Sequence, residues 1–117
     1  MRCIKKYFIT SVGRIRQEDV MTKKEEILFY LRQFKGEKKE QYSILKMGVF
    51  GSVARDDMNA DSDIDIVVEL GKTDLFYLIG IKQELEEALH RKVDIIRYRN
   101  DMNAFLKKRI DKEAVYV

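Results

Sequence analysis

The most informative stretch of the sequence is residues 51–70, GSVARDDMNADSDIDIVVEL, which join a Gly-Ser turn to a run of β-branched residues. The expected fold follows from this stretch. The β-branched content of residues 63–70 predicts a strand. Side chains two residues apart on a strand point to the same face, so Asp63 and Asp65 are expected side by side. The opposite face carries the apolar residues Ile64, Ile66, Val68 and Leu70. We expect that second face to pack into a core.

The pair of carboxylates at Asp63 and Asp65 predicts a bound cation. Two like charges about 4 Å apart repel by ~1 kcal/mol in water and ~4 kcal/mol at an effective dielectric constant of 20. One or two carboxylates plus substrate phosphates are the usual ligands of Mg²⁺. Taken alone, an Asp-x-Asp pair is also typical of a helix cap or a solvated turn. The prediction of a bound cation therefore depends on Asp94 and on the Gly51-Ser52 turn.

A third acid, Asp94, interrupts the apolar run Val93–Ile96. Burying a carboxylate there costs several kcal/mol unless it is paired or metal-bound. We expect a buried Asp94 on a strand beside residues 63–70, where three carboxylates would converge. Two of them would ligate a metal that carries a triphosphate, and the third would bind a second metal or act as a general base. The plainer alternative is a charge on an edge strand.

The Gly51-Ser52 turn predicts a phosphate cradle. Glycine allows close approach of the backbone, free N–H groups point outward, and the Ser52 hydroxyl adds a donor. Arg55 can reach a phosphate, or it can pair with Asp57 or Asp61. Ser62 is a second candidate nucleotide ligand, although the pattern favours a role in the loop or as a cap.

Working outward, the periodicities predict alternating helices and strands. Thr22 and Glu25 form a capping-box pattern for a first helix that Gly36 is expected to end. Asp74 is expected to cap a later helix, and His90 to end it. The other expected elements are a strand at 44–50, a helical turn at 53–57, a strand at 92–98, a helix from about residue 101, and an apolar tail at 114–117 that packs or adds a short strand.

This order, α-β-α-β-α-β-α, predicts an α+β fold of the α/β-sandwich type, in which helices pack on a short mixed sheet. The 117 residues suit one domain, which we assign to residues 21–117. The net charge of +3 resides in residues 1–20, which we interpret as a basic N-terminal extension. Because the excess lies in one terminal segment, direct binding of nucleic acid is not expected.

The apolar runs and the cysteine content indicate whether a membrane segment is expected and which compartment the protein occupies. No apolar run approaches the roughly 18 residues needed to cross a bilayer, so no membrane segment is expected. The single cysteine, Cys3, cannot form an internal disulfide, which favours a cytoplasmic protein.

The combined motif resembles the DNA polymerase β-like nucleotidyltransferase superfamily, whose signature is Gly-Ser, ten residues, then Asp-x-Asp. The longer form, with Ala54-Arg55 and with Ser62 before Asp63, is similar to the minimal nucleotidyltransferase (MNT) branch. The segments 74–76, 85–87, 91–95 and 113–116 also look like that branch, and the resemblance covers roughly residues 22–117. Val53 departs from it, because the family often has Tyr, Arg or His there.

The resemblance implies a palm-like nucleotidyltransferase fold with Gly51 and Ser52 as triphosphate binders. It implies Asp63, Asp65 and Asp94 as a catalytic, metal-binding triad with two Mg²⁺ ions. Members of the MNT branch are commonly antitoxins encoded beside a HEPN-domain toxin, and the implied activity is transfer of AMP from ATP to a toxin tyrosine. The alternatives are an antitoxin that acts by occlusion, and nucleotidyl transfer to a small molecule. The oligomeric state stays open.

Overall fold

The computed structural model describes residues 22–117, so the expected basic extension over residues 1–20 lies outside the described residues. None of the helices in this part of the chain combines the length and the apolar character that crossing a bilayer requires. The elements, in chain order, are α1 (Lys23–Lys38), β1 (Ile44–Phe50), α2 (Ser52–Arg55), β2 (Ile64–Leu70), α3 (Leu75–Leu89), β3 (Val93–Arg97), α4 (Ala104–Glu113) and β4 (Val115–Tyr116).

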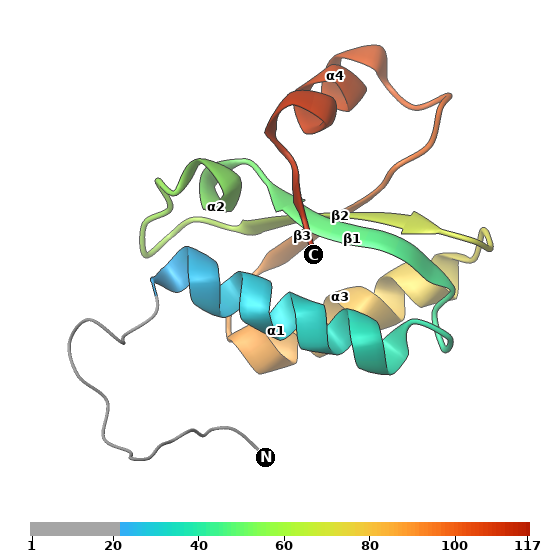
Figure 1. The fold of residues 1–117 in the computed structure, drawn as a ribbon, viewed down its shortest axis with the longest axis horizontal. Coiled ribbons are helices and arrows are strands. Elements are labelled where there is room, and N and C mark those ends of the chain that lie inside the picture. The colour runs from blue at the N-terminus through green and yellow to red at the C-terminus, as the bar shows by residue number, and fades with distance from the viewer. Residues whose placement is uncertain (1–21) are drawn as a thin grey trace.

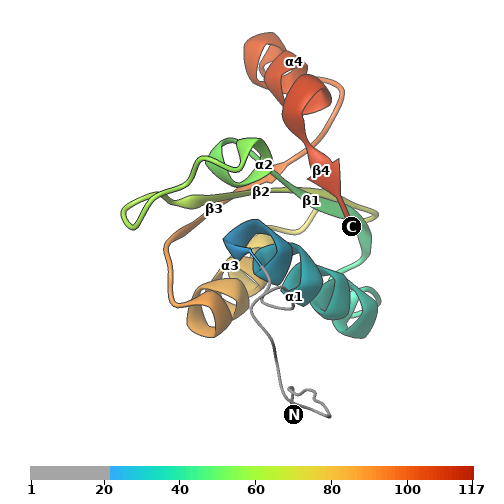
Figure 2. The same ribbon diagram turned by 60° about the vertical axis from the view of Figure 1, so that its left-hand side comes forward.

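The four strands form one mixed sheet in the order β3-β2-β1-β4. β1 pairs antiparallel with β2 and with β4, whereas β2 and β3 are parallel and are connected through α3. Helices α1 and α3 cover one face of the sheet and α4 lies on the other (Figures 1 and 2). The short helix α2 follows the end of β1 and contributes Val53 to the core that α1 and α3 form. The expected α+β fold with a short mixed sheet is therefore confirmed.

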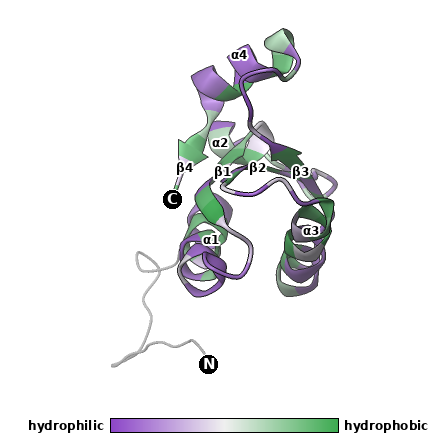
Figure 3. Ribbon diagram, turned by 90° about the vertical axis from the view of Figure 1, so that its right-hand side faces the viewer, coloured by the Kyte–Doolittle hydropathy of each residue, from purple (hydrophilic) through white to green (hydrophobic). Residues whose placement is uncertain are grey.

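The main core lies between the sheet and the pair α1 and α3. It contains the face of β2 that the period of two predicted, because Ile64, Ile66 and Val68 are fully buried. A smaller apolar cluster on the other face joins α4 to the sheet through Phe50, Val67, Met102 and Ile110. Figure 3 shows the strands mainly in the hydrophobic colour and α4 mainly in the hydrophilic one. Helix α4 therefore leaves much of its polar surface free for other contacts.

The cap residues expected from the sequence are confirmed. The Glu25 N–H donates to Thr22 Oγ1 at 3.1 Å, and the Thr22 N–H donates to Glu25 Oε1 at 2.9 Å. Asp74 Oδ1 accepts the N–H of Phe76 at 2.9 Å. His90 ends α3 in the left-handed conformation with a φ of 55°.

Gly36 does not end the first helix, and that prediction is wrong. Helix α1 continues through Gly36 to Lys38, with Lys35 and Lys38 in its last turn, where basic side chains favour the helix dipole. An added Cβ at Gly36 would meet nothing within 4 Å, so the helix passes this residue on an open surface. The apolar tail forms β4, and Val115 and Val117 also pack against the core, so both expected roles of the tail are confirmed.

Candidate active site

The three candidate carboxylates come from two neighbouring parallel strands. Asp65 on β2 is in register with Asp94 on β3, and Asp63 lies directly before β2. The expected placement of the Asp94 strand beside the Asp63/Asp65 strand is therefore confirmed. The expected burial of Asp94 is wrong, because its side chain is exposed. The reason is that β3 is the edge strand of the sheet.

The carboxyl of Asp65 is partly buried and lies close to charges of both signs. Burial raises the pKa of the Asp65 carboxyl, and the negative charges of Asp94 and Asp63 raise it further. The positive charges of Arg109 and Arg55 oppose this shift of the pKa. Asp65 therefore carries a negative charge that its carboxylate neighbours disfavour, which is the electrostatic condition that a bound cation would relieve.

These acids fit a divalent cation whose coordination is completed by other ligands. Within residues 22–117, no three His, Cys, Asp or Glu side chains come together closely enough to hold a metal ion by themselves, so the expected convergence of Asp63, Asp65 and Asp94 on one point is not found. Mg²⁺ does not need such a cage, since it keeps several waters and is bound through one or two carboxylates plus phosphate oxygens. The oxygen-only donor set of Asp63, Asp65 and Asp94 therefore fits Mg²⁺ in the company of a phosphate ligand.

Gly51 lies directly against the carboxylate of Asp65. Its φ is +70°, a left-handed conformation that favours glycine. A Cβ added at Gly51 would collide with Oδ2 of Asp65 and would lie 3.5 Å from Nη2 of Arg109. The Gly-Ser turn and the carboxylates therefore form one site, with Ser52 as the first residue of α2.

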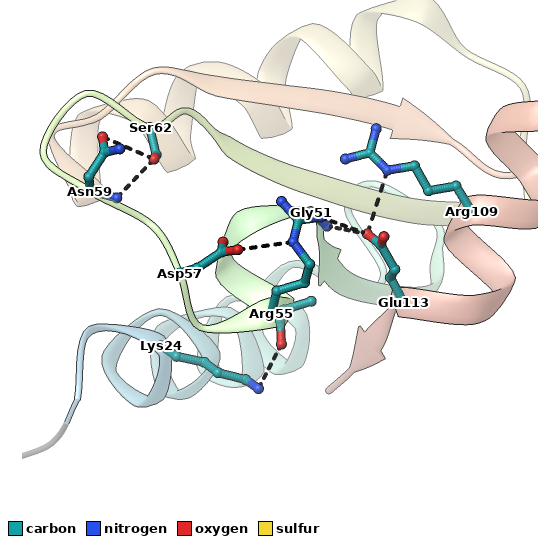
Figure 4. Close-up of polar contacts among 9 residues, drawn as sticks. Lys24, Gly51, Arg55, Asp57, Asn59, Ser62, Arg109 and Glu113 are labelled. Atoms are coloured by element: carbon teal, nitrogen blue, oxygen red, sulfur yellow. Dashed lines mark hydrogen bonds and ion pairs between the residues drawn. The ribbon is translucent and has the colours of Figure 1, made fainter.

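An alternating chain of charges runs along this turn (Figure 4). Arg55 pairs with Asp57 at 3.2 Å and with Glu113 at 3.3 Å, so the pairing with Asp57 named as an alternative is confirmed. Glu113 Oε1 also accepts the N–H of Gly51 at 3.1 Å and lies 3.5 Å from Nε of Arg109. Helix α4 thus brings a carboxylate and a guanidinium to the Gly-Ser turn.

The loop before Asp63 is held by hydrogen bonds within itself and by Arg91. The Ser62 hydroxyl accepts from the Asn59 N–H at 2.9 Å and donates to Asn59 Oδ1 at 3.2 Å, so Ser62 has the loop role that the sequence left open. Its role as a nucleotide ligand stays a prediction. The Arg91 guanidinium donates to the carbonyl oxygens of Asn59, Ala60 and Ser62.

The sequence indicates Lys107, Lys108 and Arg109 as complements of a helix C-terminus, with contact to a nucleotide or partner as the alternative. It does not indicate Glu113 or Arg91 as individual site residues. The i, i+4 spacing of Arg109 and Glu113 at the end of a helix indicates an ion pair, but nothing in the pattern indicates which end of the sheet that helix reaches. Arg91 lies two residues before β3, in the segment 91–95 that resembles the MNT branch, but neither fact indicates that its side chain reaches the loop before Asp63.

The family model for the nucleotidyltransferase domain matches residues 31–117, which contain the whole site. The chain belongs to this family. Among its relatives, this nucleotidyltransferase is 36% identical over 93 residues to MJ0126 of Methanocaldococcus jannaschii, covering 79% of this chain and 95% of that protein. It is 33% identical over 94 residues to the protein adenylyltransferase MntA of Thermococcus cleftensis, covering 80% of this chain and 94% of that protein.

Solved structures agree with the nucleotidyltransferase fold. One described as a minimal nucleotidyltransferase superposes with a TM-score of 0.65 at 30% identity, over 77% of this chain and 92% of that one. A toxin–antitoxin structure with AMP-PNP shares the fold, with a TM-score of 0.59 at 22% identity over 68% of this chain and 66% of that one. The resemblance to the MNT branch is thereby confirmed.

Proposed function

We propose that this nucleotidyltransferase transfers AMP from ATP to a tyrosine hydroxyl of a cognate HEPN-domain toxin and thereby silences it. The observation that carries the proposal is the in-register pair Asp65 and Asp94 beside the Gly51 turn. The Thermococcus cleftensis relative, named a protein adenylyltransferase, supports a protein as the acceptor. The toxin–antitoxin structure with AMP-PNP supports the same class of partner and an adenine nucleotide as the donor.

The reaction is an in-line displacement at the α-phosphorus of ATP. The acceptor oxygen forms the new O–P bond, the bond from the α-phosphorus to the bridging oxygen breaks, and pyrophosphate leaves with that oxygen. Gly51 and Ser52 would hold the triphosphate through the backbone N–H and the hydroxyl, and Arg55 would balance its charge. Asp94 is exposed at the edge of the sheet, so an acceptor hydroxyl can approach it and give up its proton there.

Asp63 and Asp65 would bind Mg²⁺, and Asp94 would either contribute to a second ion or serve as the base just described. Bound Mg²⁺ supplies charge neutralisation for the phosphates and for the leaving pyrophosphate. Without it, the carboxylates would repel the triphosphate that the neighbouring turn attracts.

The test is incubation of the protein with α-labelled ATP, Mg²⁺ and the toxin encoded beside it. We expect label on the toxin with the wild type and none with Asp63→Ala/Asp65→Ala. The matched control is Asp56→Ala/Asp61→Ala, which removes two exposed acids from the same connection between α2 and β2 and should keep the labelling. Equal labelling by the wild type and the Asp63/Asp65 variant would contradict the proposal. Replacing the acceptor tyrosine with phenylalanine should remove the label.

A second candidate is an antitoxin that acts by occlusion. The observation that favours it is a set of strongly exposed apolar side chains, with Phe76 79% and Phe105 86% exposed, which suits a surface that binds protein. This candidate predicts that the Asp63→Ala/Asp65→Ala variant still protects cells from the toxin. Loss of protection in that variant, with binding of the toxin retained, would exclude it.

A further inference from the structure

Three donors converge on one carboxylate oxygen beside the Gly-Ser turn. Glu113 Oε1 lies 3.1 Å from the Gly51 nitrogen, 3.3 Å from Nη1 of Arg55 and 3.5 Å from Nε of Arg109. The Glu113 side chain is only 22% exposed, so solvent screens these contacts incompletely. A backbone N–H and two guanidinium groups around one oxygen constitute an anion-binding arrangement, and Glu113 supplies the anion (Figure 4).

The same donors are the ones that a triphosphate needs at this turn. A triphosphate at Gly51 would compete with Glu113 for the Gly51 N–H and for Arg55. If Glu113 stayed in place, its negative charge would lie against the phosphates with little water between them, which is costly. Rotation of the Glu113 side chain removes that repulsion and frees Nη1 of Arg55 and Nε of Arg109 for phosphate oxygens, while Nε of Arg55 keeps its pairing with Asp57.

We propose that Glu113 is a built-in competitor of the triphosphate: its carboxylate holds the phosphate-binding donors in the free protein and leaves them when the nucleotide binds. Arg109 is then a further phosphate-binding residue, released from Glu113 by the same exchange. Its guanidinium lies beside the Gly51 turn and its charge reaches Asp65, so α4 brings a positive charge to the site. This inference rests on the proposed function, because it assumes that a triphosphate binds at Gly51.

The experiment is calorimetric titration of the full chain with inorganic tripolyphosphate in the presence of Mg²⁺, a probe that carries no base. Glu113→Gln keeps the size of the side chain and removes its charge, and we expect roughly a fivefold lower Kd than for the wild type. Glu113→Asp keeps the charge but is one methylene too short to reach the Gly51 nitrogen, so its Kd should also fall. Arg109→Gln should raise the Kd several-fold. The matched control, Glu87→Gln, makes the same charge change at an exposed site on α3 and should leave the Kd within about twofold.

The outcomes separate this inference from the function on which it rests. An unchanged or higher Kd for both Glu113 variants, each shown to be folded by circular dichroism, would overturn the competitor role and leave the proposed function standing. If neither tripolyphosphate nor ATP with Mg²⁺ bound to the wild type, the proposed function would fail and this inference with it.

Discussion

At the scale of single residues, Gly51 combines a positive φ with contact to a carboxylate. Gly51→Ala forces a Cβ into the left-handed region and against Asp65, so we expect a loss of about 1–3 kcal/mol in the free energy of unfolding, together with loss of ATP binding. Urea denaturation and calorimetry measure the two effects. The matched control is Gly36→Ala within α1, where space is open and alanine should stabilise by about 0.5–1 kcal/mol. Equal effects of the two changes would contradict this interpretation of Gly51.

The raised pKa of Asp65 predicts the direction in which the stability of the protein changes with pH. The pKa of Asp65 in the folded protein is raised above its ordinary value of 3.8. The favourable contribution of the protonated group is therefore complete below pH 3.8 and is lost as the pH rises through the folded-state pKa. At pH 7 without Mg²⁺, Asp65→Asn removes the disfavoured charge and should raise the Tm by on the order of a few degrees. At about pH 3.5 the wild-type carboxyl is protonated in the folded protein, so this gain in Tm should vanish.

The control for the Asp65 prediction is Asp61→Asn, which makes the same charge change in the exposed loop. It should move the Tm little at either pH, because exposed charges contribute little to stability. A gain for Asp65→Asn that is as large at pH 3.5 as at pH 7 would contradict the assigned cause.

The sequence predicted the site residues whose placement follows from local geometry. The period of two correctly put Ile64 and Ile66 in the core and Asp65 outside it. The burial of Asp94 was predicted wrongly, because its apolar neighbours do not reveal that β3 is an edge strand. Glu113 was missed for a similar reason: its contact with Gly51 spans 62 residues and depends on the path of α4.

At the scale of elements, Arg91 links the start of β3 to the loop that leads into β2. Its guanidinium donates to three carbonyl oxygens of residues 59–62, including Ser62 at 2.9 Å, directly before Asp63. Arg91→Ala leaves these carbonyls without that partner, so we expect a loss of about 1–2 kcal/mol in the free energy of unfolding and faster amide exchange across the loop. Hydrogen-exchange mass spectrometry measures the latter.

Arg32→Ala is the control for the Arg91 prediction, since Arg32 is an exposed arginine on α1. It should leave the exchange of residues 59–62 unchanged. Unaltered exchange in the Arg91 variant would show that the loop does not depend on this side chain. If the variant keeps ATP binding but transfers AMP more slowly, Arg91 acts by positioning Asp63.

The sequence pattern predicted the helices and strands correctly where the signal came from residues close together in the chain. The capping box at Thr22 and the β-branched runs predicted α1, β1 and β2 closely. The end of α1 was missed because the packing of Ile27, Leu31 and Phe34 against the core stabilises the helix beyond Gly36. The pairing of β4 with β1 requires Gly48, where an added Cβ would collide with the Val115 carbonyl oxygen, and a single sequence does not reveal that contact.

At the level of the whole molecule, one face of the sheet forms the main core and the other carries the candidate site. The face under α1 and α3 buries the large core, and the other face carries the Gly-Ser turn with α4 beside it (Figures 1 and 2). The site therefore draws on β1, β2, β3 and α4, which span most of the described chain. For this reason we expect ligand binding to stabilise the whole domain.

The most direct test of the account is the unfolding free energy of the full chain with ATP and Mg²⁺ together, and with each alone. At 100 times Kd, the combination should add about 2.7 kcal/mol to the wild type, and either component alone should add far less. The Asp63→Ala/Asp65→Ala variant should gain nothing from the combination. Equal stabilisation of that variant, or full stabilisation of the wild type by ATP without Mg²⁺, would contradict the claim that these carboxylates bind a metal-chelated nucleotide.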